Sequence, residues 1–400
     1  MAREAPRDWL GYFFPMMLSV GTLVLLGIGS IHAWAGARED EARKQVVFLC
    51  FAVAAFLAVQ LVNYRKLLRY SLLFYLLTLL PLAYTVASRA HDRVYGLPFA
   101  KPVKGACAWI QLGPISIQPS EFAKIALVMF LAWILRQEEQ QRQRSGRMIL
   151  QVLGFSFLSL VLVLQQPDLG MVLTMLTPVL ALLFVSGIRK RYLAGLFLSG
   201  LLALPVLWLS GTCDLMGSAC PDCPNVPVLR HLPQVVKHYQ RSRVYSLFSA
   251  DPRIQQEGGY QQERALEAIG SGGLRGKGQG DISVSRHVPE AQNDMVLALI
   301  GEQYGLLGIA VVLLSYTLLF GAGIAIAMVH REPAGKLLAV GLVVLMAGQT
   351  LFNLGVILRL LPVTGLTLPF VSYGGSSLVA NFMVVGLLVN IARNQKKAMF

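Results

Sequence analysis

Apolar runs of about 20 residues recur along the whole chain, and each is long enough to cross the ~30 Å hydrocarbon layer of a bilayer as a helix. Of the 400 residues, 55% are hydrophobic and only 14% are charged. These runs predict an all-α polytopic membrane protein with about ten transmembrane helices. The expected spans are residues 10–31, 46–62, 69–87, 119–135, 149–164, 170–187, 192–210, 304–329, 336–357 and 375–392.

We expect a single membrane domain, residues 1–400, with a large extracytoplasmic loop, residues 211–293, between helices 7 and 8. The formal charge of +14 does not indicate a nucleic-acid partner, because the Lys and Arg residues separate the apolar runs instead of forming one basic face. Basic residues in short loops mark the cytoplasmic side and contact membrane lipids. Arg65, Lys66, Arg69, Arg136, Arg142, Arg144, Arg147, Arg189, Lys190, Arg191, Arg331, Lys336, Arg393, Lys396 and Lys397 all fall on one predicted side. Both termini are therefore expected in the cytoplasm, and residues 32–45, 88–118, 211–293 and 358–374 on the opposite face.

The most informative polar stretch is residues 271–308, which is rich in glycine and lies between apolar blocks. We expect a helix to start near its end, with Pro289 in the first turn and Glu290 beside it at the positive end of the helix dipole. Asp294 would follow one turn later, near the bilayer surface, where ionisable groups are costly unless they are used or solvated. Asp294 is the first candidate for chemistry.

Two similar motifs, Gln118-Pro119-Ser120-Glu121 and Gln166-Pro167-Asp168-Leu169, each place an acid before an apolar run. Both read as helix starts, because proline fits the first turn and an acid there meets the dipole. Both acids, with Lys124 one turn after Glu121, would also enter the membrane from the same side. Membrane-embedded charges tend to face a cavity or each other, so we expect Lys124 and Asp168 to line a cavity.

Two further segments carry alternatives. Trp109 lies in a polar loop, where a tryptophan either anchors the membrane interface or stacks on a sugar or lipid. Residues 361–377 crowd proline and glycine into an apolar region. Such backbone is tolerated at membrane depth only against protein or a water-filled cavity, so we expect a re-entrant or capping loop that contains Ser372 and Tyr373.

The five cysteines carry less information. Cys50 is expected inside a span as a small apolar residue. Cys213, Cys220 and Cys223 cluster in the large outer loop, where a disulfide between two of them is favoured over a metal site, because no second Cys pair completes a zinc tetrahedron. Cys107 is an alternative disulfide partner.

Seven motifs, taken in order, resemble the SEDS family of RodA, FtsW and SpoVE over nearly the whole chain. They are residues 109–113 (WIQLG), 118–124 (QPSEFAK), 166–170 (QPDLG), 259–261 (GYQ), 269–273 (IGSGG), 288–294 (VPEAQND) and 368–377 (LPFVSYGGSS). The segments at 276–278 and 361–363 are more similar to the elongation member RodA than to the division member FtsW. The resemblance implies a peptidoglycan glycosyltransferase of the bacterial cytoplasmic membrane that polymerises lipid II at its outer face, beside a class B penicillin-binding protein.

By position, Asp294 matches the family's essential acid, Trp109 a tryptophan linked to activity, and Lys124 and Asp168 polar positions of the central cavity. The chain departs from the family where Cys107-Ala108 replaces a basic residue, which leaves Lys104 as another source of charge there. It departs again where Gln292-Asn293-Asp294-Met295 replaces His-Thr-Asp-Phe.

The implied reaction is an inverting attack of a sugar 4-hydroxyl on the anomeric carbon of a second lipid-linked disaccharide, with Asp294 as the expected general base. The leaving pyrophosphate needs positive charge, from Arg275, Lys277, Arg286 or the deeper Lys124, or from a divalent cation, Mg²⁺ or Mn²⁺. The residues expected to contact substrate are Trp109, Glu121, Lys124, Asp168, Arg275, Lys277, Glu290, Ser372 and Tyr373. The alternatives are a lipid II flippase, which a ten-helix bundle with a polar cavity would also suit, and a scaffold that only recruits the penicillin-binding protein.

Overall fold

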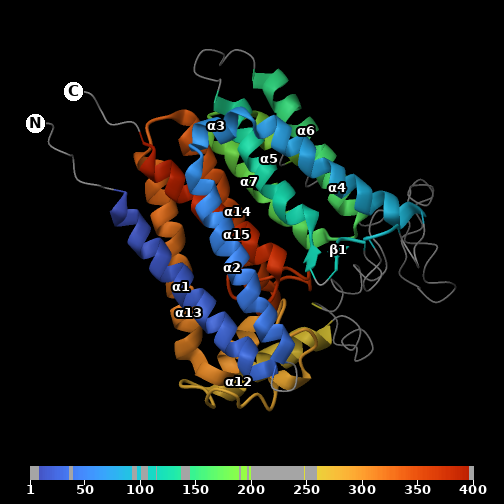
Figure 1. Ribbon diagram of the computed structural model, residues 1–400, viewed down its shortest axis with the longest axis vertical. Coiled ribbons are helices and arrows are strands. Elements are labelled where there is room, and N and C mark those ends of the chain that lie inside the picture. Colours follow the sequence, from blue (N-terminus) through green and yellow to red (C-terminus); the bar gives the residue numbers. More distant parts are fainter. Residues whose placement is uncertain are drawn as a thin grey trace, which may run out of the picture.

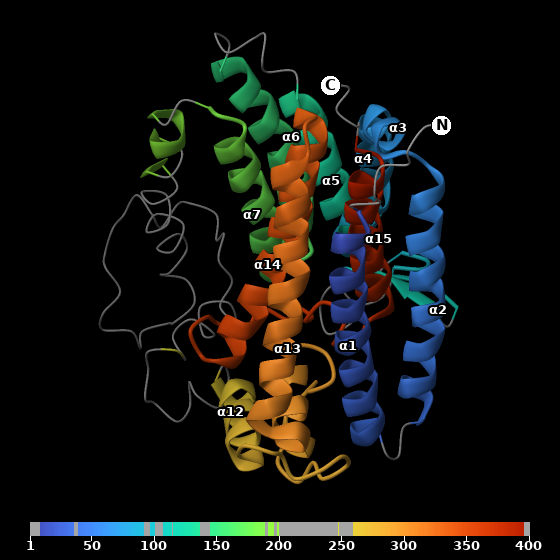
Figure 2. The same cartoon turned by 90° about the vertical axis from the view of Figure 1, so that its left-hand side faces the viewer.

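The computed structural model describes residues 9–35, 39–91, 97–100, 107–113, 115–136, 145–188, 191–195, 198–199, 247 and 259–395. Long helices run side by side along one axis of the molecule, with the short helices α3 and α12 at its opposite ends (Figure 1, Figure 2). The helices are α1 (Leu10–Ala35), α2 (Glu39–Leu61), α3 (Tyr64–Arg69), α4 (Ser71–His91), α5 (Pro119–Leu135), α6 (Ser145–Gln165), α7 (Leu169–Val185), α12 (Tyr260–Gly272), α13 (Val296–Val329), α14 (Pro333–Ile357) and α15 (Gly375–Arg393). A short antiparallel hairpin, β1 (Ile110–Leu112) and β2 (Ile115–Ile117), pairs Ile110 with Ile117 before α5.

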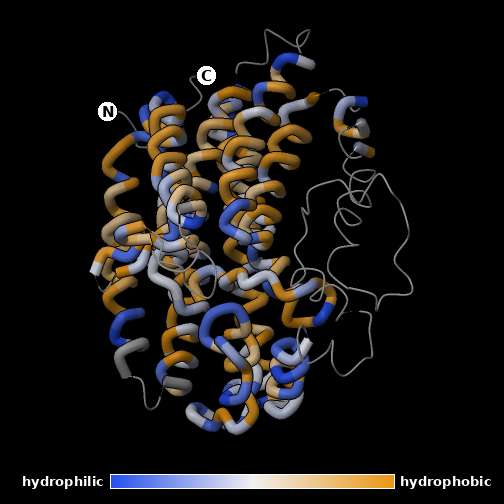
Figure 3. Tube along the Cα trace, turned by 90° about the vertical axis from the view of Figure 1, so that its right-hand side faces the viewer, coloured by the Kyte–Doolittle hydropathy of each residue, from blue (hydrophilic) through white to orange (hydrophobic). Residues whose placement is uncertain are grey.

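The predicted all-α polytopic membrane fold is confirmed. Within the described ranges, seven helices are long and apolar enough to cross a membrane, namely α1, α2, α4, α6, α13, α14 and α15. Helices α5 and α7, of 17 residues each, occupy two more predicted spans. Of the remaining span, residues 192–210, only 192–195 and 198–199 are described, and both stretches are helical; the rest of the span and most of the loop 211–293 lie outside the described residues. Hydrophobic residues follow the helices, whereas hydrophilic residues gather around α12 and its loop (Figure 3).

One end of the bundle is tied together by polar side chains around α3, and we call it the α3 end. Arg65 donates to both carboxylate oxygens of Glu332, at 2.8 and 2.9 Å, which joins α3 to the α13–α14 connection. Asn63 donates to the Asn394 side chain at 2.9 Å, which adds the end of α15. The predicted cytoplasmic loops before α3 and between α13 and α14 therefore meet at one end, while the orientation in the membrane stays a prediction.

The opposite end, the α12 end, corrects the expected start of α13. Residues 288–294 form turns, and the helix begins at Val296, so Pro289 and Glu290 are not in a first helical turn. Glu290 instead adopts a positive φ of 53°. The physical reason is the tertiary contact of this segment: Tyr373 donates its backbone N–H to the Gln292 carbonyl at 2.8 Å, which holds residue 292 in a turn.

Helix α13 is longer than predicted because two helical segments are joined across a break at Gly305. The glycine-rich loop supplies hydrogen bonds at this break. Gly305 has φ 67°, a conformation that favours glycine and interrupts the helical hydrogen bonds. The loop at residues 273–278 restores them: Lys277 and Gly278 donate to the carbonyls of residues 302 and 303, and residues 306 and 307 donate to the carbonyls of Gly273 and Leu274. The predicted span 304–329 is thus the part of α13 beyond the break.

Helices α1 and α2 are also longer than predicted. Helix α1 extends to Ala35 and α2 starts at Glu39, so most of the predicted loop 32–45 is helical. Polar residues at the helix ends explain the difference, because the sequence prediction counted only the apolar residues of each run.

We predict that Gly272→Ala disrupts the docking of α12 on α13. An added Cβ would lie 2.0 Å from the Gly301 carbonyl oxygen, which belongs to a helix backbone and cannot move aside. We expect a loss of about 2 kcal/mol or more, seen as a lower melting temperature in detergent. Gly270→Ala, in the same helix with no atom within 4 Å, is the control and should be neutral or stabilising. Equal melting temperatures for the two variants would contradict the close packing.

Candidate active site

The segment between α14 and α15, residues 358–374, is the polar centre of the α12 end. As expected from its proline and glycine content, it is non-helical, and most of its residues from Val363 to Ser372 are buried against protein. Side chains from three helices, α2, α13 and α14, and from the segment itself hydrogen-bond its backbone. Gln349 donates to the Thr367 carbonyl, Asn353 to Leu366, Gln45 to Ser372 and Tyr316 to Pro369, and the Ser372 hydroxyl accepts from the Leu368 N–H.

Lys124 and Glu121 form a buried ion pair inside this centre. The Lys124 ammonium lies 2.6 Å from the Glu121 carboxylate, and the two side chains are 1% and 2% exposed. Lys124 also donates to the Gln349 amide oxygen at 2.7 Å, and that side chain in turn holds Thr367. The predicted meeting of membrane-embedded charges is thus present for this pair, and it connects α5 to α14 and to the segment 358–374.

Asp168 lies beside this pair, in the turn between α6 and α7. Its carboxylate accepts from the Met171 N–H at 2.9 Å as the N-cap of α7, and from the Gln118 side chain at 3.1 Å. The two prolines therefore mark helix starts, with Pro119 as the first residue of α5. Burial raises the pKa of Asp168 from 3.8 to about 6; the Met171 N–H opposes the rise, Glu121 adds to it, and Lys124 lowers it.

Asp294 lies in the turn before α13 and is 7% exposed. Its carboxylate accepts from the Gln261 side chain of α12 at 3.2 Å, and its backbone carbonyl accepts from Asn353 of α14 at 2.7 Å. Asn353 is one helical turn from Gln349, the partner of Lys124. One face of α14 therefore carries both the contact to Asp294 and the contact to the buried ion pair.

The remaining predicted contacts of the glycine-rich stretch divide into two groups. Lys277 is paired with Glu302, at 2.7 Å, and Glu302 also accepts from the backbone N–H groups of Val284 and Ser285. Lys277 therefore has a partner within the protein that shapes the loop. Arg275 and Glu290 are exposed, and Glu290 accepts from Asn293 at 2.7 Å.

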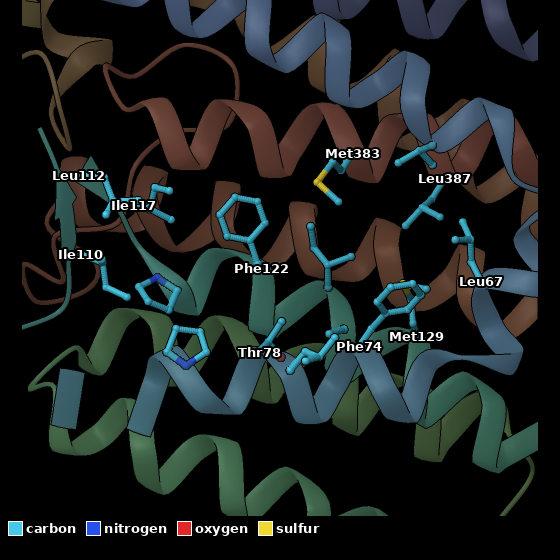
Figure 4. A pocket seen from close by; sticks show the side chains of 16 residues that line it. Leu67, Phe74, Thr78, Ile110, Leu112, Ile117, Phe122, Met129, Met383 and Leu387 are labelled. Atoms are coloured by element: carbon cyan, nitrogen blue, oxygen red, sulfur yellow. The ribbon is translucent and has the colours of Figure 1, made fainter. Parts of the chain in front are cut away.

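An apolar groove of about 460 Å³ runs along α5 and opens beside the hairpin (Figure 4). Phe122 and Met129 of α5, Met383 and Leu387 of α15, and Ile110, Leu112 and Ile117 of the hairpin line it. Trp109 is half-buried directly before β1, next to this lining. Helix α5 thus presents an apolar face to the groove and, through Glu121 and Lys124, a charged face to α14.

The sequence prediction missed Gln349, Asn353, Gln261 and Glu302. Gln349 and Asn353 were visible as two amides spaced four residues apart inside an apolar span, a spacing that places both on one helix face. Gln261 stands in the motif at residues 259–261, which gave it no role. Glu302 had no comparable signal, because its partners lie 17–25 residues away in the glycine-rich loop.

The cysteine prediction is tested only in part, and the divalent cation stays a prediction. Cys50 is exposed on α2 and Cys107 is buried, and both are free thiols. Cys213, Cys220 and Cys223 lie outside the described residues. Where the structure describes the chain, it contains no cluster of three or more His, Cys, Asp or Glu side chains that could hold a metal ion.

The sequence matches one family model and is similar to several named proteins. Residues 11–397 match the family model described as cell cycle protein, FtsW/RodA/SpoVE. The chain is 32% identical to stage V sporulation protein E of Bacillus subtilis over 391 residues, covering 94% of this chain and 96% of that protein. It is 33% identical to the probable peptidoglycan glycosyltransferase FtsW of Geobacter sulfurreducens over 298 residues, 74% of this chain and 72% of that protein.

Two solved structures share the fold. The crystal structure of the rod shape determining protein RodA of Thermus thermophilus superposes with a TM-score of 0.67 at 26% identity, over 98% of this chain and 100% of that one. A chain from a structure of a peptidoglycan synthase complex, described as coordinating polymerisation and crosslinking, gives a TM-score of 0.71 at 27% identity, over 96% and 98% of the two chains. Proteins named as a sporulation protein, as FtsW and as a rod shape determining protein all match, so the particular likeness to RodA stays a prediction.

We predict that Lys124→Met alone strongly destabilises the protein, because it leaves the Glu121 carboxylate buried without its countercharge. Breaking a buried pair from one side costs about 3–5 kcal/mol. The double variant Glu121→Met/Lys124→Met removes both charges and should recover most of the loss in melting temperature. If the double variant is as unstable as the single one, packing and not charge would be the dominant effect.

We predict that Asp168→Asn removes a pH dependence of stability. The folded-state pKa of Asp168 is raised, so between pH 3.8 and about 6 the folded protein holds a proton that the unfolded chain releases. Stability should therefore fall as the pH rises through this window, by about 3 kcal/mol. Asparagine keeps the N-cap oxygen without the charge, so the difference in melting temperature between variant and wild type should grow from pH 4 to pH 7. Parallel curves would contradict the shift.

Proposed function

The chain belongs to the FtsW/RodA/SpoVE cell cycle protein family, and from this premise we propose that it is a peptidoglycan glycosyltransferase that polymerises lipid II. The observation that carries this proposal is the position of Asp294, held from two helices at the end of the bundle that also contains the buried polar centre. The names of its relatives support the reaction class, and the geometry supports the residues.

Asp294 is the proposed general base. The 4-hydroxyl of the acceptor sugar attacks the anomeric carbon of the donor, a C–O bond forms, and the bond to the lipid pyrophosphate breaks with inversion. A carboxylate within hydrogen-bond reach takes the hydroxyl proton as positive charge develops on the donor sugar. Gln261 and Asn353 orient Asp294 from α12 and α14, so the base is positioned before substrate binds.

The apolar groove is the proposed site for the lipid chain of the substrate. Its lining is almost entirely hydrocarbon, and Pro119 and Phe122 place its hairpin end beside the start of α5, which carries Glu121. A lipid chain in the groove would hold its headgroup near Trp109 and the polar centre. This arrangement supports substrate contacts for Trp109, Glu121, Lys124, Asp168, Ser372 and Tyr373.

Surface chemistry is favoured over translocation of lipid II. A flippase needs a polar path through the full depth of the membrane. The buried pair on α5 is instead followed by apolar residues, Ile125 to Ala132, all of which are buried. The polar centre is therefore confined to one end of the bundle, which favours a reaction at one membrane surface.

The partner and the location follow from the same proposal. The synthase complex that shares this fold couples polymerisation to crosslinking, which supports a class B penicillin-binding protein as the partner of this chain. The protein would lie in the bacterial cytoplasmic membrane with both termini in the cytoplasm and the α12 end outside. Arg275, Lys277, Arg286 and a divalent cation, Mg²⁺ or Mn²⁺, stay proposed sources of positive charge.

We predict that Asp294→Asn abolishes polymerisation of lipid II without loss of folding. Removing a general base lowers the rate by about 10²–10⁴-fold, and asparagine keeps the size of the side chain. The measurement is glycan-strand formation from purified lipid II by the detergent-solubilised protein with its penicillin-binding partner. Asp281→Asn, an exposed acid in the same stretch, is the matched control. An active Asp294→Asn protein would exclude the base, and an inactive wild type would exclude the function.

A further inference from the structure

Helix α14 ends in a Schellman motif that has an arginine at the position usually occupied by glycine. The Leu360 N–H donates to the Gly355 carbonyl at 2.8 Å, and the Arg359 N–H donates to the Val356 carbonyl at 3.1 Å. These are the two hydrogen bonds that define the motif, and they make Arg359 its left-handed residue. Its φ of 55° agrees with this assignment.

An arginine at this position costs stability. A side chain in the left-handed region brings Cβ close to the following carbonyl, a strain that glycine avoids and asparagine tolerates. Folding alone would therefore favour glycine or asparagine at residue 359. Non-glycine residues held in this region cluster at functional sites, which directs attention to what the guanidinium does.

The turn that contains Arg359 is hydrogen-bonded to α12, the helix that also orients the Asp294 carboxylate. Gln262 of α12 donates to the Val356 and Leu361 carbonyls, at 2.6 and 2.8 Å, on both sides of Arg359. Its neighbour Gln261 donates to the Asp294 carboxylate. Asn353, which holds the Asp294 backbone, lies six residues before Arg359, roughly 9 Å along the helix axis. Two adjacent residues of α12 thus hold the Asp294 carboxylate and the turn that carries Arg359.

The chemistry of the site requires such a cation. A departing pyrophosphate needs preorganised positive charge, and a guanidinium binds phosphate oxygens in pairs. Arg359 is half-buried, between the exposed Leu358 and Leu360, at the surface where a lipid headgroup would lie.

We propose that Arg359 binds the pyrophosphate of the lipid-linked substrate and stabilises it as the leaving group. The bond from the anomeric carbon to the phosphate oxygen breaks, the electron pair stays on that oxygen, and the guanidinium remains protonated throughout. This inference rests on the proposed glycosyltransferase function and adds to it the group that receives the leaving charge.

The first experiment measures binding in lipid nanodiscs, independently of catalysis. The probes are a polyprenyl pyrophosphate, inorganic pyrophosphate and the uncharged polyprenol, and the variants are Arg359→Gly, Arg359→Asn and Arg359→Lys. Loss of a charge-assisted contact should weaken polyprenyl pyrophosphate binding by about tenfold or more in the Gly and Asn variants and by less in the Lys variant. Polyprenol binding should not change. Weaker binding of both pyrophosphates would indicate a phosphate contact alone, and an effect confined to the lipid would indicate the headgroup at the membrane.

The second measurement separates function from folding. Because glycine relieves the left-handed strain, Arg359→Gly should melt about 1–3 °C higher than wild type while it polymerises lipid II more slowly. Arg331→Gln, an exposed arginine at the α3 end, is the control and should match wild type in both assays.

Several results would overturn the inference. Wild-type pyrophosphate binding and polymerisation in Arg359→Gly would do so and would leave the proposed function intact. A lower melting temperature of that variant, with parallel loss of polyprenol binding, would show a structural role instead. An inactive wild type would refute the glycosyltransferase proposal, and the binding comparison would still decide whether Arg359 holds pyrophosphate.

Discussion

The structure depends on hydrogen-bond partners for the backbone N–H and carbonyl groups of residues 358–374. This non-helical segment lies against other helices. Away from water, each unpaired carbonyl or N–H costs free energy, so such a segment is stable only where side chains replace the missing backbone partners. Gln349 and Asn353 do this from α14, and Gln45 does so from α2. Asn353 also holds the Asp294 carbonyl. The same requirement therefore builds the interior and positions the candidate base.

Helix α5 joins the two chemical environments that the proposed lipid-linked substrate would need. Its apolar side, with Phe122 and Met129, lines the groove, while Glu121 and Lys124 face the polar centre. A buried ion pair is weak evidence for stability, because desolvation offsets much of its attraction. Here Lys124 also bonds Gln349, so the pair connects the groove-lining helix to the helix that holds Asp294.

The break in α13 joins this helix to the glycine-rich loop at the α12 end. Gly305 interrupts the helix, and the loop at 273–278 supplies the displaced hydrogen bonds, which brings Lys277 to Glu302. This arrangement uses one of the cations that the sequence suggested for the leaving group. At the end of α14, Arg359 adopts a left-handed conformation, and it is the residue that we propose for binding the leaving group.

The sequence by itself determined the class of fold, the positions of nine helices and the candidate base. Membrane insertion depends on the local density of apolar residues, and the ordered motifs were readable along the chain. The start of α13 was predicted wrongly because a tertiary bond to Tyr373 keeps residue 292 in a turn. Only the tertiary structure decided which polar groups meet. Lys124 and Gln349 are 225 residues apart, and Lys277 and Glu302 are 25 apart. Such pairs form because burial forces each polar group to find a partner in space, and no local pattern encodes that choice.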